Sequence, residues 1–322
     1  MPFLGTLVSS TLDLLDRMMD GGYPIGVSTN ITPFDDIIGG GWARQQLTYL
    51  VGDSGVGKSW LVSYLALAGA KRLLKEGHIA TGYQASDAFG EIGQRVADKG
   101  GKTPLIVFWS LEMPPTPITM RLLSQALDGG GGSITSSRLV SKEISLDTLH
   151  DAVDCLKPIE QHIYFEFDAH TTNEFRLVLN DLTMTHDIVM VIVDYFRLIE
   201  EIAIDGSISG QQAGKSEHLR AIAKDYDCHV LSIFDINREG EKSRKPSSSF
   251  MKGGTAAKFD GDLVIYAFID ELSCDKDGRP NTNPVCLVLD VVKGRFVEQK
   301  TLKLSLDRAT GKVEEWRKHD DG

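Results

Sequence analysis

The chain has 322 residues, of which 42% are hydrophobic and 25% charged, and its formal net charge is −11. These values are ordinary for a globular protein with one large α/β domain or two small ones. No apolar run approaches the roughly 18 residues that a membrane span needs, and the N-terminal segment lacks the basic start of a targeting signal. The four cysteines form no CxxC pair, which argues against a structural zinc site. We therefore expect an intracellular protein with no membrane partner.

The acidic balance limits how this chain could bind nucleic acid. Proteins that coat nucleic acid are usually basic, whereas this chain has 34 Lys and Arg residues against 45 Asp and Glu residues. A local basic patch can still bind a polyanion. Any nucleic-acid site must therefore be confined to a loop or to the inside of a pore.

The N-terminal segment has the pattern of an amphipathic helix ahead of the main domain. Residues 10–13 resemble a capping box, and leucine and methionine then recur at helical spacing until Gly21 and Gly22. The pattern divides the chain into residues 1–24 and 25–322. Such a helix could pack on its own domain, or it could be a linker helix that docks on a neighbouring subunit, and we take the second as the prediction.

Strand-like and helix-like segments alternate through most of the remaining chain. Apolar runs typical of buried strands occupy 47–51, 104–110, 163–167, 188–194 and 229–234. Helical periodicity follows these runs at 59–75, 118–123, 175–182 and 217–226. This alternation predicts an α/β fold with a mostly parallel sheet flanked by helices. The C-terminal part is strand-rich, and 77–102 and 200–214 have the composition of surface loops.

The decisive motif is a glycine-rich segment between a predicted strand and a predicted helix. It has the GxxxxGK[ST] spacing of a P-loop and consists of Gly52, Asp53, Ser54, Gly55, Val56, Gly57, Lys58 and Ser59. The glycines allow consecutive backbone N–H groups to face phosphate oxygens, at a helix N-terminus that favours anions. Lys58 would bridge the terminal phosphates, and the Ser59 hydroxyl would hold Mg²⁺. The motif therefore predicts ATP and Mg²⁺ as cofactors.

Two carboxylates could complete a hydrolytic site. Asp194 closes the apolar run 188–193, and Glu112 directly follows the run 104–110. Ligands of open α/β sheets bind at the carboxyl ends of the strands. We therefore predict that Asp194 supports Mg²⁺ together with Ser59, and that Glu112 orients the attacking water. An acidic residue that merely ends a strand is the simpler alternative for each.

A second GKS sequence, at 214–216, does not fit a P-loop. Its glycines, Gly210 and Gly214, are one residue too close together, and the preceding residues 203–209 are polar. We predict that this segment is a solvated loop.

Several short motifs resemble those of the DnaB-like replicative DNA helicases, which are RecA-fold hexameric ring motors. They are Ser110-Leu111-Glu112-Met113, Val193-Asp194-Tyr195, Gly26-Val27-Ser28-Thr29, Phe34-Asp35-Asp36 and Lys293-Gly294-Arg295-Phe296. The resemblance extends over roughly residues 5–316. It implies a RecA-like P-loop NTPase fold for 25–322, which would be the motor domain.

The resemblance also implies roles for individual residues. Glu112 would be the catalytic carboxylate, joined by Lys58 of the P-loop. Arg295, with Lys293, would reach into the ATP site of the adjacent subunit as an arginine finger, since arginine stays charged and forks onto phosphate. A plain surface arginine is the alternative for Arg295.

Two segments would contact DNA under this resemblance. One follows Asp194, at about 200–214, and the other spans 238–254. The second is a basic cluster in an acidic protein, made of Arg238, Lys242, Arg244, Lys245 and Lys252 and followed by Gly253 and Gly254. Cations and backbone amides suit sequence-independent contact with phosphates. A solvated charged loop is the alternative.

Asp235 departs from the family pattern. The family carries a glutamine or histidine at this place, which senses the γ-phosphate, whereas a carboxylate would repel it. Either Asn237 or Arg238 would take over the role, or the coupling would be altered. Residues 253–259 also resemble RecA recombinases as much as ring helicases.

The resemblance implies an ATP-dependent single-stranded DNA translocase and helicase that acts as a ring oligomer in DNA replication. Its expected partners are single-stranded DNA, further copies of itself in a hexamer, and a primase or loader. The expected location is the cytoplasm of a bacterial cell or a phage-infected host. The alternatives are a RecA-like recombinase or regulatory ATPase, and a weakly hydrolysing loader or adaptor module.

Overall fold

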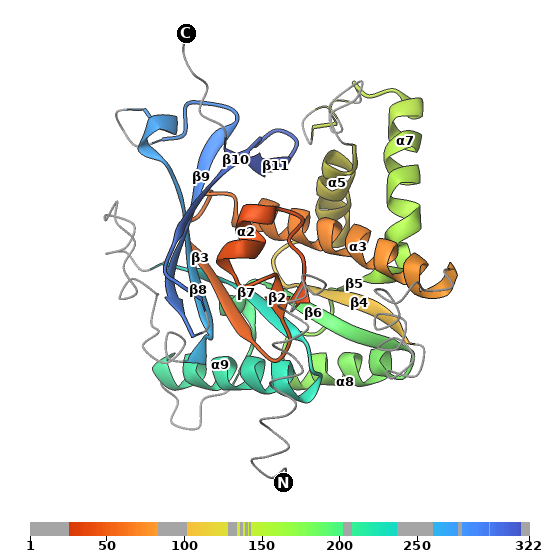
Figure 1. Cartoon of the computed structure of the whole chain (residues 1–322), viewed down its shortest axis with the longest axis vertical. Coiled ribbons are helices and arrows are strands. Elements are labelled where there is room, and N and C mark those ends of the chain that lie inside the picture. The colour runs from red at the N-terminus through yellow and green to blue at the C-terminus, as the bar shows by residue number, and fades with distance from the viewer. Residues whose placement is uncertain are drawn as a thin grey trace.

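One nine-stranded sheet forms the centre of the molecule (Figure 1). The computed structural model describes residues 26–82, 102–127, 134–135, 138, 141, 143–201, 208–236, 260–275, 279–295 and 297–316. The predicted linker helix at 1–24 lies outside these residues. Within them, no helix is both long and apolar enough to cross a membrane.

The sheet has the strand order β11-β10-β9-β8-β3-β7-β6-β4-β5, and its central part is parallel. The parallel strands are β8 (Leu263–Ile269), β3 (Leu47–Gly52), β7 (His229–Asp235), β6 (His186–Asp194), β4 (Thr103–Ser110) and β5 (Ile163–Glu166). Gly52 pairs in register with Asp235, and Ser110 pairs with Asp194. The carboxyl ends of four neighbouring strands therefore meet at one edge, as the sequence predicted.

The last three strands are antiparallel and extend the sheet beyond β8. They are β9 (Val285–Gly294), β10 (Thr301–Leu306) and β11 (Val313–Glu315). β9 runs back along β8, so Gly294 at the end of β9 pairs with Leu263 at the start of β8. A separate two-stranded sheet joins β1 (Gly26–Val27) to β2 (Trp42–Ala43).

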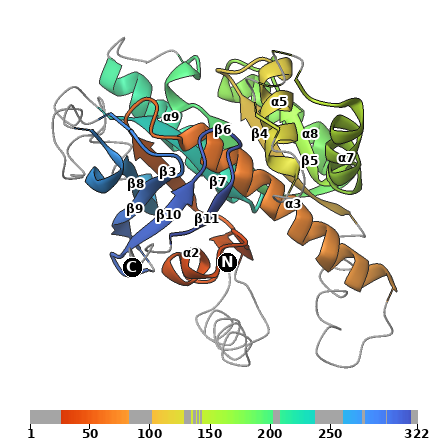
Figure 2. The same cartoon turned by 90° about the horizontal axis from the view of Figure 1, so that it is seen from above.

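Helices cover both faces of the sheet (Figures 1 and 2). One face carries α2 (Thr32–Ile37), α3 (Lys58–Gly82), α5 (Pro115–Ala126) and α7 (Leu146–Leu156). The other face carries α8 (Thr172–Thr183) and α9 (Ile208–Asp225). Figure 2 shows α3 crossing the sheet, with β9 to β11 on one side of it and α5 and α7 on the other. The three-layer α/β architecture is therefore as predicted.

The core is divided by the two-residue period of the strands. Ile106 and Phe108 of β4 pack on the face of α3, whereas Val107 and Trp109 pack on the face of α8. The Trp109 ring stacks on Phe175 of α8, with ring centroids 4.1 Å apart. Successive side chains of a strand point to opposite faces, so a central strand with helices on both sides must be apolar throughout. The continuous apolar runs of the sequence have this physical cause.

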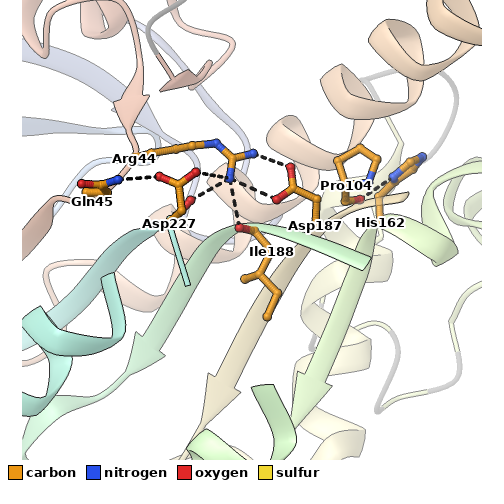
Figure 3. Close-up of polar contacts among 7 residues, drawn as sticks. All are labelled: Arg44, Gln45, Pro104, His162, Asp187, Ile188 and Asp227. Atoms are coloured by element: carbon orange, nitrogen blue, oxygen red, sulfur yellow. Dashed lines mark hydrogen bonds and ion pairs between the residues drawn. The ribbon is translucent and has the colours of Figure 1, made fainter. Parts of the chain in front are cut away.

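A polar network closes the opposite, amino-terminal edge of the sheet (Figure 3). The Arg44 guanidinium donates two hydrogen bonds to the Asp187 carboxylate, at 3.1 and 2.6 Å, and one to the Asp227 carbonyl oxygen at 2.6 Å. The Gln45 amide donates to the Asp227 carboxylate at 2.9 Å. Paired arginine–carboxylate bonds fix geometry as well as charge. The start of β3 is therefore tied to β6 and to the turn before β7.

Two stretches predicted as surface loops are partly helical. α3 continues to Gly82, so 77–82 belong to a helix, and α9 begins at Ile208, so 208–214 do as well. The prediction for the second GKS sequence was wrong, since Lys215 and Ser216 are 8% and 0% exposed on α9. The Ser216 hydroxyl lies 2.7 Å from the Tyr49 hydroxyl. Polar residues can be buried where they find such partners, and their polarity alone was therefore misleading.

Candidate active site

The P-loop joins β3 to α3 and lines a cavity of about 880 Å³. Seven of its eight residues line this cavity, while Val56 packs against the hydrophobic core. Gly57 has a φ of +105°, and a Cβ atom there would lie 2.4 Å from Leu306 Cδ2. Glycine adopts positive φ without strain. The loop can therefore turn its backbone toward the cavity only because of the residue that the motif specifies.

Lys58 is held inside the P-loop. Its Nζ donates to the carbonyl oxygens of Gly52 and Asp53, both at 2.8 Å, and lies 3.5 Å from Asp235 Oδ1. The side chain is 8% exposed. Burial lowers the pKa of Lys58, and the nearby Asp235 carboxylate opposes this change. The ammonium group is thus fixed beside the turn where phosphates would bind.

Ser59 and Asp194 are brought together across the sheet edge, as predicted. Ser59 Oγ donates to Asp194 Oδ1 over 3.4 Å, and Asp194 is 1% exposed. Asp194 Oδ2 has no hydrogen-bond partner among the described residues. The pKa of Asp194 is raised to about 6, because burial and then the neighbouring Glu112 carboxylate outweigh the opposing effects of Ser59, Arg121 and Lys58.

These residues fit a bound Mg²⁺. Magnesium is usually held by one or two protein oxygens, several waters and the phosphates of a substrate. Ser59 and Asp194 supply such oxygens, and one carboxylate oxygen of Asp194 is buried without a partner, which is a costly state that a cation would relieve. In the described part of the chain, no cluster of three or more His, Cys, Asp or Glu residues could hold a metal alone.

Glu112 is fixed next to Asp194 through the backbone. The N–H groups of Leu111 and Glu112 donate to the Asp194 carbonyl oxygen at 2.8 and 3.2 Å. Glu112 lines the same cavity as the P-loop and Asp194. A carboxylate at the mouth of a phosphate-binding loop can orient a water for attack. The arrangement can therefore bind a nucleoside triphosphate and hydrolyse it.

Three arginines that were not predicted from the sequence also line the cavity: Arg121, Arg197 and Arg308. The Arg121 guanidinium lies 4.8 Å from the ring centre of Trp60, and burial lowers its pKa. Arg197 comes three positions after Asp194, so its closeness to a strand end was a usable signal. Arg121 is on α5 and Arg308 follows β10, and nothing in their sequence surroundings indicates a site.

Lys293 and Arg295 are not part of this cavity. Lys293 is at the end of β9 and Arg295 directly follows that strand, whose last residue Gly294 pairs with Leu263. Gly52, the first residue of the P-loop, pairs with Ala267. Four residues of β8 separate these two levels, which is about 13 Å along a strand. Arg295 Nη1 lies 3.2 Å from Asp262 Oδ1, just before β8. Within one chain, Arg295 is therefore at the opposite edge of the sheet from the P-loop.

The predicted DNA-contacting residues lie outside the described part of the chain. This applies to Arg238, Lys242, Arg244, Lys245, Lys252, Gly253 and Gly254 and also to Asn237. Of the other predicted DNA segment, 202–207 is likewise not described. Their assignment stays a prediction.

Known proteins resemble this chain in sequence and in fold. A family model described as the DnaB-like helicase C terminal domain matches residues 26–315. The replicative DNA helicase DnaB of Mycoplasma genitalium is 24% identical over 212 residues, which covers 63% of this chain and 44% of that protein. The same helicase of Haemophilus influenzae is 24% identical over 213 residues, covering 62% and 45%. The chain thus spans less than half the length of these curated relatives.

Solved structures match the fold over almost the whole chain. The ATPase domain of G40P has a TM-score of 0.76 at 16% identity, covering 97% of this chain and 99% of that one. A DnaB-like replicative helicase, solved for its interactions with primase, has a TM-score of 0.73 at 15% identity, covering 96% and 66%. At these identities the likeness concerns the fold, and it confirms the predicted RecA-like architecture.

Proposed function

Because the chain belongs to the DnaB-like helicase C-terminal domain family, we propose that it is an ATP-dependent single-stranded DNA translocase and helicase. It would act as a ring oligomer in DNA replication. One observation carries the proposal: Lys58, Ser59, Glu112 and Asp194 come from three different strand ends and face one cavity. Curated relatives named replicative DNA helicase support the choice of reaction.

ATP hydrolysis is the chemical step that this site supports. The backbone of the P-loop and the Lys58 ammonium bind the phosphates. Ser59 and Asp194 would hold Mg²⁺, which would supply positive charge to the phosphate oxygens. The Glu112 carboxylate orients a water in line with the terminal phosphate and accepts its proton. The backbone N–H groups of Leu111 and Glu112 each donate one hydrogen bond to the Asp194 carbonyl oxygen. These two bonds keep Glu112 at a fixed distance from the acid that would hold the metal.

Arg295 would complete the active site of an adjacent subunit. It lies at the edge of its own sheet opposite the P-loop, so it cannot reach its own phosphates. Its side chain is 42% exposed beside Asp262, and Lys293 lies two positions earlier, at the end of β9. A fork of N–H donors from a neighbour would stabilise charge on the transferred phosphoryl group. A hexameric ring of identical subunits meets this requirement, and a linker helix at 1–24 that docks on a neighbour would join them.

Single-stranded DNA is the proposed track of the motor. The basic residues of 238–254 would contact phosphates from inside the ring, which suits a protein with a net charge of −11 because the cations need only be locally dense. The related structure solved for interactions with primase suggests a primase as a further partner.

Lys58→Ala tests the proposal. The wild-type protein should hydrolyse ATP faster with single-stranded DNA than without it, and should separate a forked duplex. Lys58→Ala should remove both activities and keep the circular-dichroism spectrum, while Lys312→Ala, which changes a half-exposed lysine, should keep both activities. Strand exchange without duplex unwinding would favour a recombinase instead. DNA binding without turnover in the wild type would favour a loader or adaptor.

A further inference from the structure

Asp235 lines the nucleotide cavity, where the negative charge of a carboxylate is unfavourable. It ends β7 beside the P-loop, because Asp235 pairs in register with Gly52. Its two carboxylate oxygens face two different cations: Oδ1 lies 3.5 Å from Lys58 Nζ, and Oδ2 lies 4.0 Å from Arg197 Nε. An uncompensated negative charge here would repel a phosphate. The position of Arg197 beside this carboxylate therefore bears on how the cavity binds phosphate.

Arg197 is oriented by its own neighbours. Its Nε and Nη2 donate to the Tyr195 hydroxyl at 3.2 and 2.7 Å, and its guanidinium lies 5.6 Å from the Tyr195 ring centre. Its side chain is 60% exposed and lines the same cavity as Lys58 and Glu112. Hydrogen bonding to Tyr195, followed by the charges of Asp235 and Glu112, raises the pKa of Arg197. The guanidinium stays charged, as arginine does in proteins, and it lines the cavity together with both carboxylates.

The charges that line the cavity balance without a ligand. Four cations, Lys58, Arg121, Arg197 and Arg308, stand against four carboxylates, Asp53, Glu112, Asp194 and Asp235. Asp194 and Glu112 are needed for the metal and the water, and Arg121 is stacked on Trp60. The proposed hydrolysis uses none of the side chains of Asp53, Arg308, Asp235 and Arg197, and of these Asp235 and Arg197 face each other.

We propose that Arg197 contacts the terminal phosphate of the nucleotide bound to its own chain, and that Asp235 is the positioning residue that aims Arg197. This inference rests on the proposed function, since it assigns a residue to the same ATP site. Arginine has five N–H donors in a planar fork, and the contacts with Tyr195 use Nε and Nη2. In the described structure no hydrogen bond engages Nη1, which can therefore donate to a phosphate oxygen.

The Asp235–Arg197 pair explains how a carboxylate can occupy a position where its charge alone would repel the γ-phosphate. A neutral polar sensor reports a terminal phosphate by one hydrogen bond, whereas an aspartate–arginine pair does so with a charged donor whose carboxylate partner offsets the excess charge. Asp235 also faces Lys58, so one carboxylate orients both cations that flank the phosphate site. Asn237 and Arg238 are then not needed for this role.

The test compares equilibrium binding of ADP with that of a non-hydrolysable ATP analogue, by calorimetry with Mg²⁺ present. Arg197→Gln should weaken binding of the analogue about 10- to 100-fold, the value of a charge-assisted hydrogen bond, and should change ADP binding little. Arg279→Gln removes an exposed arginine on a turn and serves as the matched control, with no change for either nucleotide.

A second variant separates positioning from direct contact. In the Arg197→Gln background, Asp235→Asn should restore part of the affinity for the analogue, because it removes a carboxylate that has lost its partner. In the wild-type background, the same substitution should reduce the preference for the analogue over ADP, because Arg197 is no longer aimed.

Four outcomes would overturn the inference. Equal loss of ADP and analogue binding in Arg197→Gln would assign a structural role to Arg197. The same effect of Asp235→Asn in both backgrounds would show that the two residues are not coupled. A wild-type protein that binds no nucleotide would overturn the proposed function together with this inference, whereas normal binding and hydrolysis with unaltered discrimination would overturn the inference alone.

Discussion

The backbone N–H of Glu112 donates a hydrogen bond to the carbonyl oxygen of Asp194 over 3.2 Å. This bond joins the ends of β4 and β6, which are neighbours in the sheet although more than eighty residues separate them in the chain. The acid proposed to orient water and the acid proposed to support Mg²⁺ therefore move as one unit. The two residues differ in burial, since Asp194 is 1% exposed whereas Glu112 is exposed at the cavity wall.

Glu112→Gln should abolish turnover and leave nucleotide binding intact. The amide keeps the shape and the backbone hydrogen bond but cannot accept the proton of the attacking water, and general-base catalysis is typically worth about 10²–10⁴ in rate. Steady-state hydrolysis and the dissociation constant for ATP with Mg²⁺ are the two measurements. Glu160→Gln, at an exposed position, is the control and should behave as wild type. Weakened ATP binding in Glu112→Gln would contradict a purely catalytic role.

Asp194→Asn should stabilise the nucleotide-free protein and remove its hydrolytic activity. Ionisation of this buried carboxylate is unfavourable, because burial and Glu112 raise its pKa from 3.8 to about 6. Removing the charge should increase the free energy of unfolding at pH 7.5 by about 1–3 kcal/mol. Thermal unfolding measures this gain. ATP with Mg²⁺ should raise the melting temperature of the wild type and should do so much less for the variant.

The stability gain of Asp194→Asn should depend on pH with a defined sign. The folded-state pKa lies above the unfolded value, so the carboxyl contributes stability at low pH that is lost as pH rises from about 4 through about 6. The difference in melting temperature between variant and wild type should therefore be small near pH 4 and full above pH 7. His229, whose pKa burial lowers to about 4, acts in the opposite direction but is common to both proteins. A difference that shrinks with rising pH would refute this account.

Mixing two inactive variants should test whether Arg295 acts on a neighbour. Arg295→Ala should lower hydrolysis by about 10³–10⁵, the usual worth of an arginine finger, while ATP binding at the intact P-loop largely persists. Lys58→Ala has the reverse defect. In a mixed oligomer some interfaces would pair a sound P-loop with a sound finger, so partial ATP hydrolysis should reappear. DNA unwinding need not return, because most interfaces stay broken.

The mixing experiment has a clear negative outcome. If each active site needed both residues from one chain, mixing would restore nothing. Mixed oligomers must be demonstrated independently, for example by co-purification through a tag on one variant only. Their formation without any recovered hydrolysis would refute the assignment of Arg295 to a neighbouring site and would weaken the ring proposal with it.

DNA binding should depend on the basic residues of 238–254. Neutralising Lys242, Arg244, Lys245 and Lys252 together should weaken binding of single-stranded DNA and flatten its dependence on salt, because fewer counterions are released. The loss should be equal for different base sequences, since the contacts are to phosphate. Neutralising Lys157, Lys300, Lys303 and Lys312, which lie after α7 and on or near β10, provides a charge-matched control. An unchanged salt slope in the first variant would place the DNA site elsewhere.

The parallel half of the fold could be predicted because its strands are buried on both faces. The apolar runs at β3, β4, β6 and β7 each appear in the structure within one or two residues of their predicted ends. The P-loop, Glu112 and Asp194 followed directly, because residues after parallel strands must gather at one edge. In this part of the chain, the local sequence pattern is enough to indicate where a residue lies in the fold.

The remaining features depend on contacts that no local pattern contains. α7 is an exception, since its signals are local and were missed: Ser145 accepts the N-capping hydrogen bond from Thr148, and leucines recur along the helix. α9 was misjudged at its start because Lys215 and Ser216 are polar yet buried. Arg121 and Arg308 enter the cavity only through the packing of α5 and the strand β10, which are distant in sequence from the P-loop.

The reversal of β9 restricts the symmetry that an assembly can have. It puts the P-loop and Arg295 at opposite edges of one sheet, so contact between two identical edges cannot join one to the other. An interface that joins the Arg295 edge of one copy head to tail with the P-loop edge of the next is heterologous, and repetition of it gives either a closed cycle or an open helical filament. A dimer joined only through its two Arg295 edges would therefore leave every P-loop without the proposed finger. The rotation and translation that relate one copy to the next, rather than any residue in the cavity, decide whether the assembly is a ring or a filament.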